Sequence, residues 1–228
     1  MGQLELSGRV LATEAVRGRF ITVEGGEGAG KSTQVDALVA TLERSGIAAL
    51  RTREPGGSAG AEAIRELLLT GAAERWDAMT EVLLLNAARR DHVVRLIRPA
   101  LERGVWVVSD RFVDSTIAYQ GYGRGVAVAE LMAAHRLAVG DFLPDLTVIL
   151  DLPVAEGLAR AAGRGVGDDR FERLDRAFHE RLRCGFQKIA ADHPDRCVLI
   201  DAGSDAESVG RAITAAVRER LAVRLVDA

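Results

Sequence analysis

One short segment near the N-terminus constrains the fold more than any other feature of this chain. Residues Gly25 to Ser32 satisfy the pattern G-x-x-x-x-G-K-[ST], directly after the apolar run Phe20 to Val23 and at the start of a helical pattern. A strand, a glycine-rich loop and a helix in that order bind phosphate, because backbone N–H groups and the positive end of the helix point at the phosphate oxygens. The segment therefore predicts an α/β fold of the P-loop NTPase class.

The remainder of the chain alternates between apolar runs and helical patterns. Further apolar runs begin near Ala48, Val105, Leu146 and Cys197. Apolar strands separated by helices form a parallel sheet that is covered on both faces. We therefore expect a three-layer fold with a five-stranded parallel sheet. The expected helices cover about 31–45, 59–70, 78–102, 127–139, 153–162, 172–191 and 205–221.

The length of 228 residues fits one domain. Residues 1–17 precede the first strand and show little periodicity, so we interpret them as a flexible N-terminal extension. Residues 18–228 then form a single domain. Within it, the stretch at about 162–171 is rich in glycine and charge and lies between two helical patterns, which predicts a mobile lid.

The net charge, the apolar runs and the cysteines limit the partners and the cellular location that we expect for this chain. The net charge of -3 gives no reason to bind nucleic acid or an acidic membrane, so it favours a small phosphorylated ligand held by local groups. No apolar run approaches the roughly 20 residues that span a bilayer, and the N-terminus lacks the apolar core of a signal peptide. The two cysteines lie far apart, so we expect neither a disulfide framework nor a metal site there. We expect a cytoplasmic protein.

The phosphate loop contains the first residues to which we can assign a function. Lys31 supplies positive charge to the β- and γ-phosphates, and Ser32 is placed to offer its hydroxyl to a magnesium ion that bridges them. The loop alone leaves open whether the acceptor is water, a protein or a small molecule. The residues expected to bind ATP are Gly25, Gly26, Glu27, Gly28, Ala29, Gly30, Lys31, Ser32 and Thr33.

The end of the central apolar strand separates the classes of P-loop protein. The chain has no Asn-Lys pair, so a guanine-reading N-K-x-D segment is absent and GTPases of that type are excluded. Where motor and transporter ATPases carry Asp-Glu, this strand ends Ser109-Asp110-Arg111-Phe112. An Asp followed by an Arg suits a site where magnesium meets a second phosphate group, as in transfer to a phosphorylated acceptor.

Four segments together make the chain resemble the thymidylate kinase family from about Arg19 to the C-terminus. They are Phe20 to Gln34, Thr52-Arg53-Glu54-Pro55-Gly56-Gly57, Asp110 to Thr116, and Ala118-Tyr119-Gln120-Gly121. The resemblance implies a kinase that moves the γ-phosphoryl group of ATP to dTMP and gives dTDP, with Mg²⁺ as a further cofactor. It also implies a homodimer, and the long helix expected at about 78–102 could offer an apolar face to the second copy.

The same resemblance implies roles around the acceptor's phosphate. Arg53 and Arg111 would hold the 5′-phosphate, since guanidinium forks match phosphate oxygens. Asp110 would join Ser32 in the magnesium shell. Glu27 would lie near the acceptor sugar and phosphate.

Further residues would surround the base. Arg89 aligns with the family arginine that faces thymine, and Ser115, Thr116 and Gln120 would complete the polar edge. Most family members place a Phe four residues before that arginine, whereas this chain has Leu85. Aromatic stacking adds about 1–3 kcal/mol per base, so Leu85 predicts weaker acceptor binding.

The lid is expected to supply a catalytic cation. Transition-state charge needs one, and Gly28 leaves the phosphate loop without a side chain at the position some family members use. Arg164 and Arg170 are therefore the candidates in the lid. The expected catalytic residues are Lys31, Arg111, Asp110, Glu27, Arg164 and Arg170.

Two alternatives stay open at the level of sequence. Leu85 leaves room for another small-molecule kinase of the P-loop class, such as one acting on dUMP or on a nucleoside. The chain could also be a nucleotide-binding module whose lid signals to a partner. Activity on a panel of acceptors separates these hypotheses.

Overall fold

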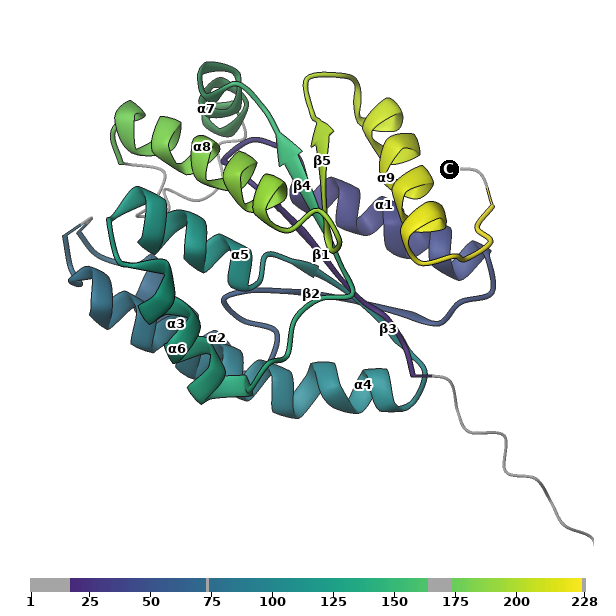
Figure 1. Cartoon of the computed structure of the whole chain (residues 1–228), viewed down its shortest axis with the longest axis horizontal. Coiled ribbons are helices and arrows are strands. Elements are labelled where there is room, and N and C mark those ends of the chain that lie inside the picture. The colour runs from purple at the N-terminus through teal and green to yellow at the C-terminus, as the bar shows by residue number, and fades with distance from the viewer. Residues whose placement is uncertain (1–16, 73, 164–173, 227–228) are drawn as a thin grey trace, which may run out of the picture.

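A computed structural model describes residues 17–72, 74–163 and 174–226 (Figure 1). A parallel sheet lies at the centre, and helices cover both of its faces. The described strands follow the order β2-β3-β1-β4-β5. They are β1 (Phe20–Gly25), β2 (Ala49–Arg53), β3 (Trp106–Asp110), β4 (Leu146–Asp151) and β5 (Cys197–Asp201). The three-layer fold expected from the sequence is confirmed.

The helices lie close to their expected positions. The α-helices are α1 (Lys31–Arg44), α2 (Ala59–Leu69), α3 (Ala78–His92), α4 (Arg98–Glu102), α5 (Val113–Thr116), α6 (Val128–Val139), α7 (Val154–Ala162), α8 (Arg176–Asp192) and α9 (Ala206–Arg220). Two π-helical segments are η1 (Val93–Ile97) and η2 (Ile117–Gly123). Most of the expected extension and of the expected lid lies outside the described residues.

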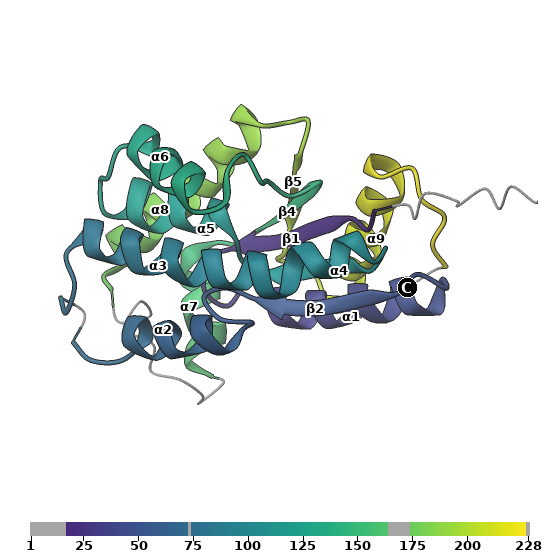
Figure 2. The same ribbon diagram turned by 90° about the horizontal axis from the view of Figure 1, so that it is seen from below.

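The core consists of two apolar layers, one on each face of the sheet. Side chains alternate along β1, so Phe20 packs into one layer and Ile21 into the other. The first layer continues under η1, α4, η2 and α8, and the second lies beneath α1 and α9. Figure 2 shows α3 and α4 in line along one side of the sheet, with α1 beneath β2. The strands' carboxyl ends, where open α/β sheets bind ligands, are thus held rigidly.

Two helical regions differ from the expectation. The helix expected at 78–102 is continuous but contains the π-helical segment η1, which ends two residues before Pro99. Proline lacks an N–H and crowds the preceding turn, which accounts for the wider spacing of the backbone bonds there. Helix α5 and η2 were not expected, because Val113 to Gly121 are buried on all sides and show no apolar stripe.

Among the described residues, no helix has both the length and the apolar content that a membrane crossing requires.

Candidate active site

The phosphate loop connects β1 to α1 as expected. Gly30 has φ +87°, a left-handed conformation that lets the loop turn directly into the helix. Lys31 Nζ donates to the carbonyl oxygen of Gly26 at 2.7 Å, so the ammonium group closes over the loop. Burial, together with the nearby charge of Arg111, lowers the pKa of Lys31 to about 8. The oxygens of a phosphate bound in the loop would favour the charged ammonium form of Lys31 again.

A serine and an aspartate from two different elements meet beside this loop. Ser32, at the start of α1, donates its hydroxyl to Asp110 Oδ2 at 2.6 Å, and Asp110 ends β3. Two hard oxygen ligands are what Mg²⁺ takes from a protein when nucleotide phosphates and water supply the others. No described group of three or more His, Cys, Asp or Glu side chains could hold a metal by itself. The residues present therefore fit a magnesium ion shared with a nucleotide.

Arg111 follows that aspartate in an unusual backbone conformation. Its φ is +74°, in the left-handed region that residues with a side chain rarely adopt, and its N–H is held by the Val23 carbonyl oxygen at 3.0 Å. The guanidinium group lies over the Tyr119 ring and donates from Nη2 to Glu27 Oε1 at 3.1 Å. The Tyr119 hydroxyl donates to the same carboxylate oxygen. The turn at Arg111 thus directs its side chain toward the phosphate loop.

Two carboxyl groups beside Arg111, those of Glu27 and Glu24, have pKa values that are shifted in opposite directions. Burial alone would raise the pKa of Glu27, but the charges of Arg111 and Lys31 outweigh it and lower the pKa to about 2. Glu24 is also buried, and there burial raises the pKa to about 8, with the neighbouring Asp114 acting in the same direction. Glu24 accepts from the Phe112 N–H at 2.7 Å and contacts the Ser115 hydroxyl. It therefore supports the backbone that directly follows Arg111.

A cavity of about 100 Å³ opens next to this cluster. Most of the residues expected around the acceptor line it. Its walls are formed by Glu27, Glu54, Pro55, Arg65, Leu69, Leu85, Arg89, Arg111, Phe112, Ser115, Thr116, Tyr119 and Gln120. The phosphate loop, the loops after β2 and β3, and helices α2, α3, α5 and η2 therefore meet at one place.

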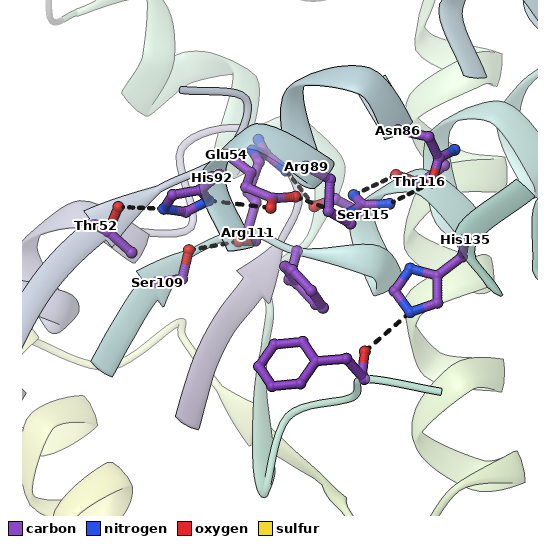
Figure 3. A network of polar contacts seen from close by, with 12 residues as sticks. Thr52, Glu54, Asn86, Arg89, His92, Ser109, Arg111, Ser115, Thr116 and His135 are labelled. Atoms are coloured by element: carbon purple, nitrogen blue, oxygen red, sulfur yellow. Dashed lines mark hydrogen bonds and ion pairs between the residues drawn. The ribbon is translucent and has the colours of Figure 1, made fainter. Parts of the chain in front are cut away.

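Arg89 is buried rather than exposed, with 1% of its surface accessible. Its Nε donates to Glu54 Oε2 and its Nη2 to Thr116 Oγ1, both at 2.9 Å (Figure 3). The guanidinium carbon lies 4.9 Å from the centroid of the Phe112 ring. A buried, fully oriented arginine in a cavity wall is suited to recognise a carbonyl or carboxylate oxygen.

Gln120 presents a second polar group to the cavity. Its Nε2 donates to Glu81 Oε2 at 2.9 Å, whereas its buried Oε1 has no hydrogen-bond partner among the described residues. A buried acceptor without a partner costs free energy unless a ligand or water satisfies it. Gln120 is therefore prepared to accept a hydrogen bond from a bound molecule.

Not every expected residue reaches the cavity. The Arg53 guanidinium is half exposed and donates to both carboxylate oxygens of Glu62 at 3.1 Å, away from the lining residues. Arg164 and Arg170 lie outside the described residues. Arg160 is described, and it binds the Ala202 carbonyl oxygen at 3.1 Å, joining α7 to the loop after β5.

The sequence interpretation assigned no role to several residues of this site. Glu24, Glu54, Arg65 and Tyr119 all belong to the site or its support. Glu24 could have been noticed as the one carboxylate in the buried strand β1. The Arg65 Nη1 donates to the Pro55 carbonyl oxygen at 2.7 Å, a contact between α2 and the preceding loop that no local pattern indicates.

A glycine-rich phosphate loop, an oxygen pair suited to magnesium and an adjoining cavity lined by arginines define a P-loop phosphotransferase with a small acceptor. A sequence profile described as thymidylate kinase matches residues 23–213. The chain belongs to the thymidylate kinase family. It is an enzyme of the phosphotransferase class, and the family uses ATP as its phosphate donor.

Similar proteins cover nearly the whole chain. The thymidylate kinase of Nitrobacter hamburgensis is 53% identical over 210 residues, which is 91% of this chain and 91% of that protein. The thymidylate kinase of Caulobacter vibrioides is 56% identical over 206 residues, or 90% of this chain and 98% of that protein. The crystal structure of thymidylate kinase from Ehrlichia chaffeensis matches with a TM-score of 0.70 and 34% identity, covering 89% of this chain and 99% of that one.

Proposed function

We propose that this enzyme transfers the γ-phosphoryl group of ATP to dTMP, giving ADP and dTDP for dTTP synthesis. The observation that carries the proposal is the cavity beside the phosphate loop, which has Arg111 at the phosphate end and Arg89 with Gln120 deeper in its wall. Thymine offers carbonyl oxygens and one ring N–H, and these match arginine N–H donors and an unpartnered amide oxygen.

The chain's own residues then perform distinct tasks. The Gly25–Ser32 backbone holds the donor phosphates, and Lys31 neutralises charge on them. Arg111 holds the acceptor phosphate in line with the donor, because phosphoryl transfer depends mainly on positioning and neutralisation of charge. Glu27, ionised and bound to Arg111, orients that guanidinium group and lies toward the acceptor sugar.

Magnesium is the second cofactor in this proposal. Ser32 and Asp110 would hold the ion, which would neutralise developing negative charge on the phosphate oxygens. The lid at about 162–171, with Arg164 and Arg170 as its catalytic candidates, stays a prediction, as do the direct phosphate contact of Arg53 and the bounds of a single domain at 18–228.

We further propose a homodimer. Helix α3 contacts both α2 and α6, and these helices and the adjoining η1 carry several exposed apolar side chains. They are Leu67 on α2, Met79 and Leu83 on α3, Val94 on η1, and Val128 and Leu137 on α6. Exposed apolar side chains gathered on neighbouring helices are typical of an interface between subunits. A cytoplasmic location without nucleic-acid or membrane partners stays a prediction.

A coupled ADP-release assay tests the reaction. ATP and magnesium are supplied with dTMP, dUMP, dCMP, dGMP, AMP, thymidine or no acceptor. A clear preference for dTMP is expected. A preference for dUMP or for a nucleoside would show that this compound, and not dTMP, is the acceptor. ATP binding without turnover on any acceptor would favour a nucleotide-binding module.

The Lys31→Ala variant tests the phosphate loop in the same assay. Removing this charge should lower kcat by roughly 10²–10³-fold, because it removes electrostatic stabilisation of the transition state. Its thermal unfolding should stay near that of the unchanged enzyme, since Lys31 belongs to neither apolar layer of the core. A folded and fully active Lys31→Ala enzyme would refute the assigned role.

A further inference from the structure

A buried row of polar side chains runs behind Arg89, from the sheet to the acceptor cavity (Figure 3). Thr52 Oγ1 lies 2.7 Å from His92 Nε2, and His92 Nδ1 lies 3.2 Å from Glu54 Oε1. The other oxygen of Glu54 accepts from Arg89 Nε. All four side chains are buried, so water does not compete for these contacts. The row joins β2 to the arginine of the cavity wall.

The chemistry of Glu54 fixes the direction of these hydrogen bonds. Burial would raise the pKa of Glu54, but Arg89 and His92 outweigh it and hold the pKa below its ordinary value. An ionised carboxylate only accepts, so His92 Nδ1 must carry the proton and donate. Each oxygen of Glu54 is thus held by a different donor, one from His92 and one from Arg89.

The loop that carries Glu54 is packed directly against the imidazole ring. A Cβ atom at Gly57 would lie 2.4 Å from His92 Nε2 and 2.5 Å from Thr52 Oγ1. The absence of a side chain at Gly57 therefore lets the loop after β2 close over the ring. This packing keeps Glu54 and His92 at hydrogen-bond distance.

The contacts on Arg89 leave part of its donor capacity for a ligand. Its Nε donates to Glu54, its Nη2 to Thr116, and its Nη1 to Asn86 Oδ1 at 3.5 Å. Its guanidinium group lies over the Phe112 ring. Arginine carries more N–H groups than these contacts use, and Arg89 lines the cavity. Arginine has no acceptor atom, so it can bind the 4-oxo group of thymine or uracil but not the 4-amino group of cytosine.

We propose that His92 and Glu54 are positioning residues that hold Arg89 in the orientation that selects a 4-oxo pyrimidine over a 4-amino one. The inference rests on the proposed function, because it takes a pyrimidine nucleotide as the acceptor. Neither residue needs to touch the base. Without the His92 donor, Glu54 is free to rotate, and Arg89 loses the contact that fixes its Nε.

Two substitutions of the same histidine separate positioning from packing. In His92→Asn the side-chain amide nitrogen replaces Nδ1 and still donates to Glu54, whereas the contact with Thr52 is lost. In His92→Gln the amide replaces Nε2, so the contact with Thr52 can persist and the donor to Glu54 is lost. The measured quantity is the ratio of kcat/KM for dTMP to kcat/KM for dCMP, with KM for ATP as the control.

We expect His92→Gln to lower this ratio roughly tenfold while KM for ATP stays unchanged, since one hydrogen bond to a charged group is lost. The Asn variant should keep most of the ratio. An equal fall in activity on both acceptors, or an unchanged ratio in His92→Gln, would overturn the proposal. If the Gln variant does not fold, the isosteric Glu54→Gln replaces it, because an amide has only one oxygen and cannot accept from both Arg89 and His92. There an unchanged ratio overturns the proposal. Failure of the unsubstituted enzyme on dTMP would instead reject the proposed function.

Discussion

Leu85 forms part of the cavity wall on α3, four residues before Arg89. An aromatic ring there could stack on a pyrimidine, whereas leucine offers only an apolar contact. We expect Leu85→Phe to lower KM for dTMP about tenfold, because stacking contributes about 1–3 kcal/mol per base. Steady-state kinetics measures this change, and Leu199→Phe at an exposed leucine on β5 is the matched control. An unchanged KM in a folded Leu85→Phe enzyme would contradict the role of Leu85.

His135 gives a prediction about pH. It is buried on α6 with Nε2 donating to the Phe142 carbonyl oxygen at 2.9 Å, and burial, with the charge of Arg89 nearby, lowers its pKa from 6.5 to about 4. Between these values the unfolded chain binds a proton that the folded chain does not. This group therefore makes stability fall as pH falls from 6.5 toward 4, by up to about 3 kcal/mol.

The His135→Gln variant isolates that contribution. Its amide can still donate to the Phe142 carbonyl oxygen but does not titrate. Urea unfolding across this pH range should give a shallower loss of stability in the variant than in the unchanged enzyme. Parallel curves for the two proteins would show that His135 does not contribute.

At this site the sequence predicts the residues that belong to local motifs, and it does not predict those that act through distant partners. The phosphate loop and Asp110-Arg111 were located because their neighbours in sequence form the motif. Glu54 and His92 act through partners that lie 35 residues or more away in the chain, as in the contacts of Glu54 with Arg89 and His92. Such pairing is created by the fold, so no local pattern indicates it.

At the scale of elements, apolar runs located all five strands but ended each of them too early, β1, β2 and β3 by two residues and β4 and β5 by one. The last residues of these strands are polar or glycine, as in Glu24-Gly25 and Ser109-Asp110, because the strands end in the functional site. Periodicity located the amphipathic helices because each has a polar face and an apolar face that alternate with the helical period. Helix α5 and η2 are buried on all sides, so they have no polar face and their sequences show no such period.

The phosphate loop and α7 are in direct backbone contact, which makes a prediction about Gly28. Its φ is +70°, and a Cβ atom there would lie 2.0 Å from the Gly157 carbonyl oxygen. We expect Gly28→Ala to destabilise the enzyme by about 2 kcal/mol or more, because strain and a backbone clash add together. Thermal unfolding measures the effect.

Gly26→Ala is the matched control within the same loop. A Cβ atom at Gly26 meets nothing within 4 Å, so this variant should unfold close to the unchanged enzyme. Equal stability of the two variants would show that the contact between the loop and α7 carries no strain. The same clash explains why this chain cannot place a catalytic arginine at position 28 without moving α7.

At the scale of the whole molecule, helices α2, α3 and α6 lie together at one end of the sheet (Figures 1 and 2). Helix α3 carries both the exposed Leu83 and the cavity residues Leu85 and Arg89. A second copy that covers the exposed side of α3 would therefore also restrict the motion of the helix that holds the base. The proposed dimer thus connects assembly to acceptor binding.

Leu83→Glu tests this connection. Leu83 is 59% exposed, so a glutamate is tolerated in a single copy but would be buried without a partner in a dimer. Light scattering should show a dimer for the unchanged enzyme and a monomer for the variant, because the dissociation constant rises roughly a hundredfold. KM for dTMP should rise in the monomer while KM for ATP stays nearly constant.

Leu199→Glu, at an exposed leucine on β5, is the control that should remain dimeric. A dimeric Leu83→Glu protein would place the interface elsewhere, because two buried and unpaired carboxylates could not persist at its centre.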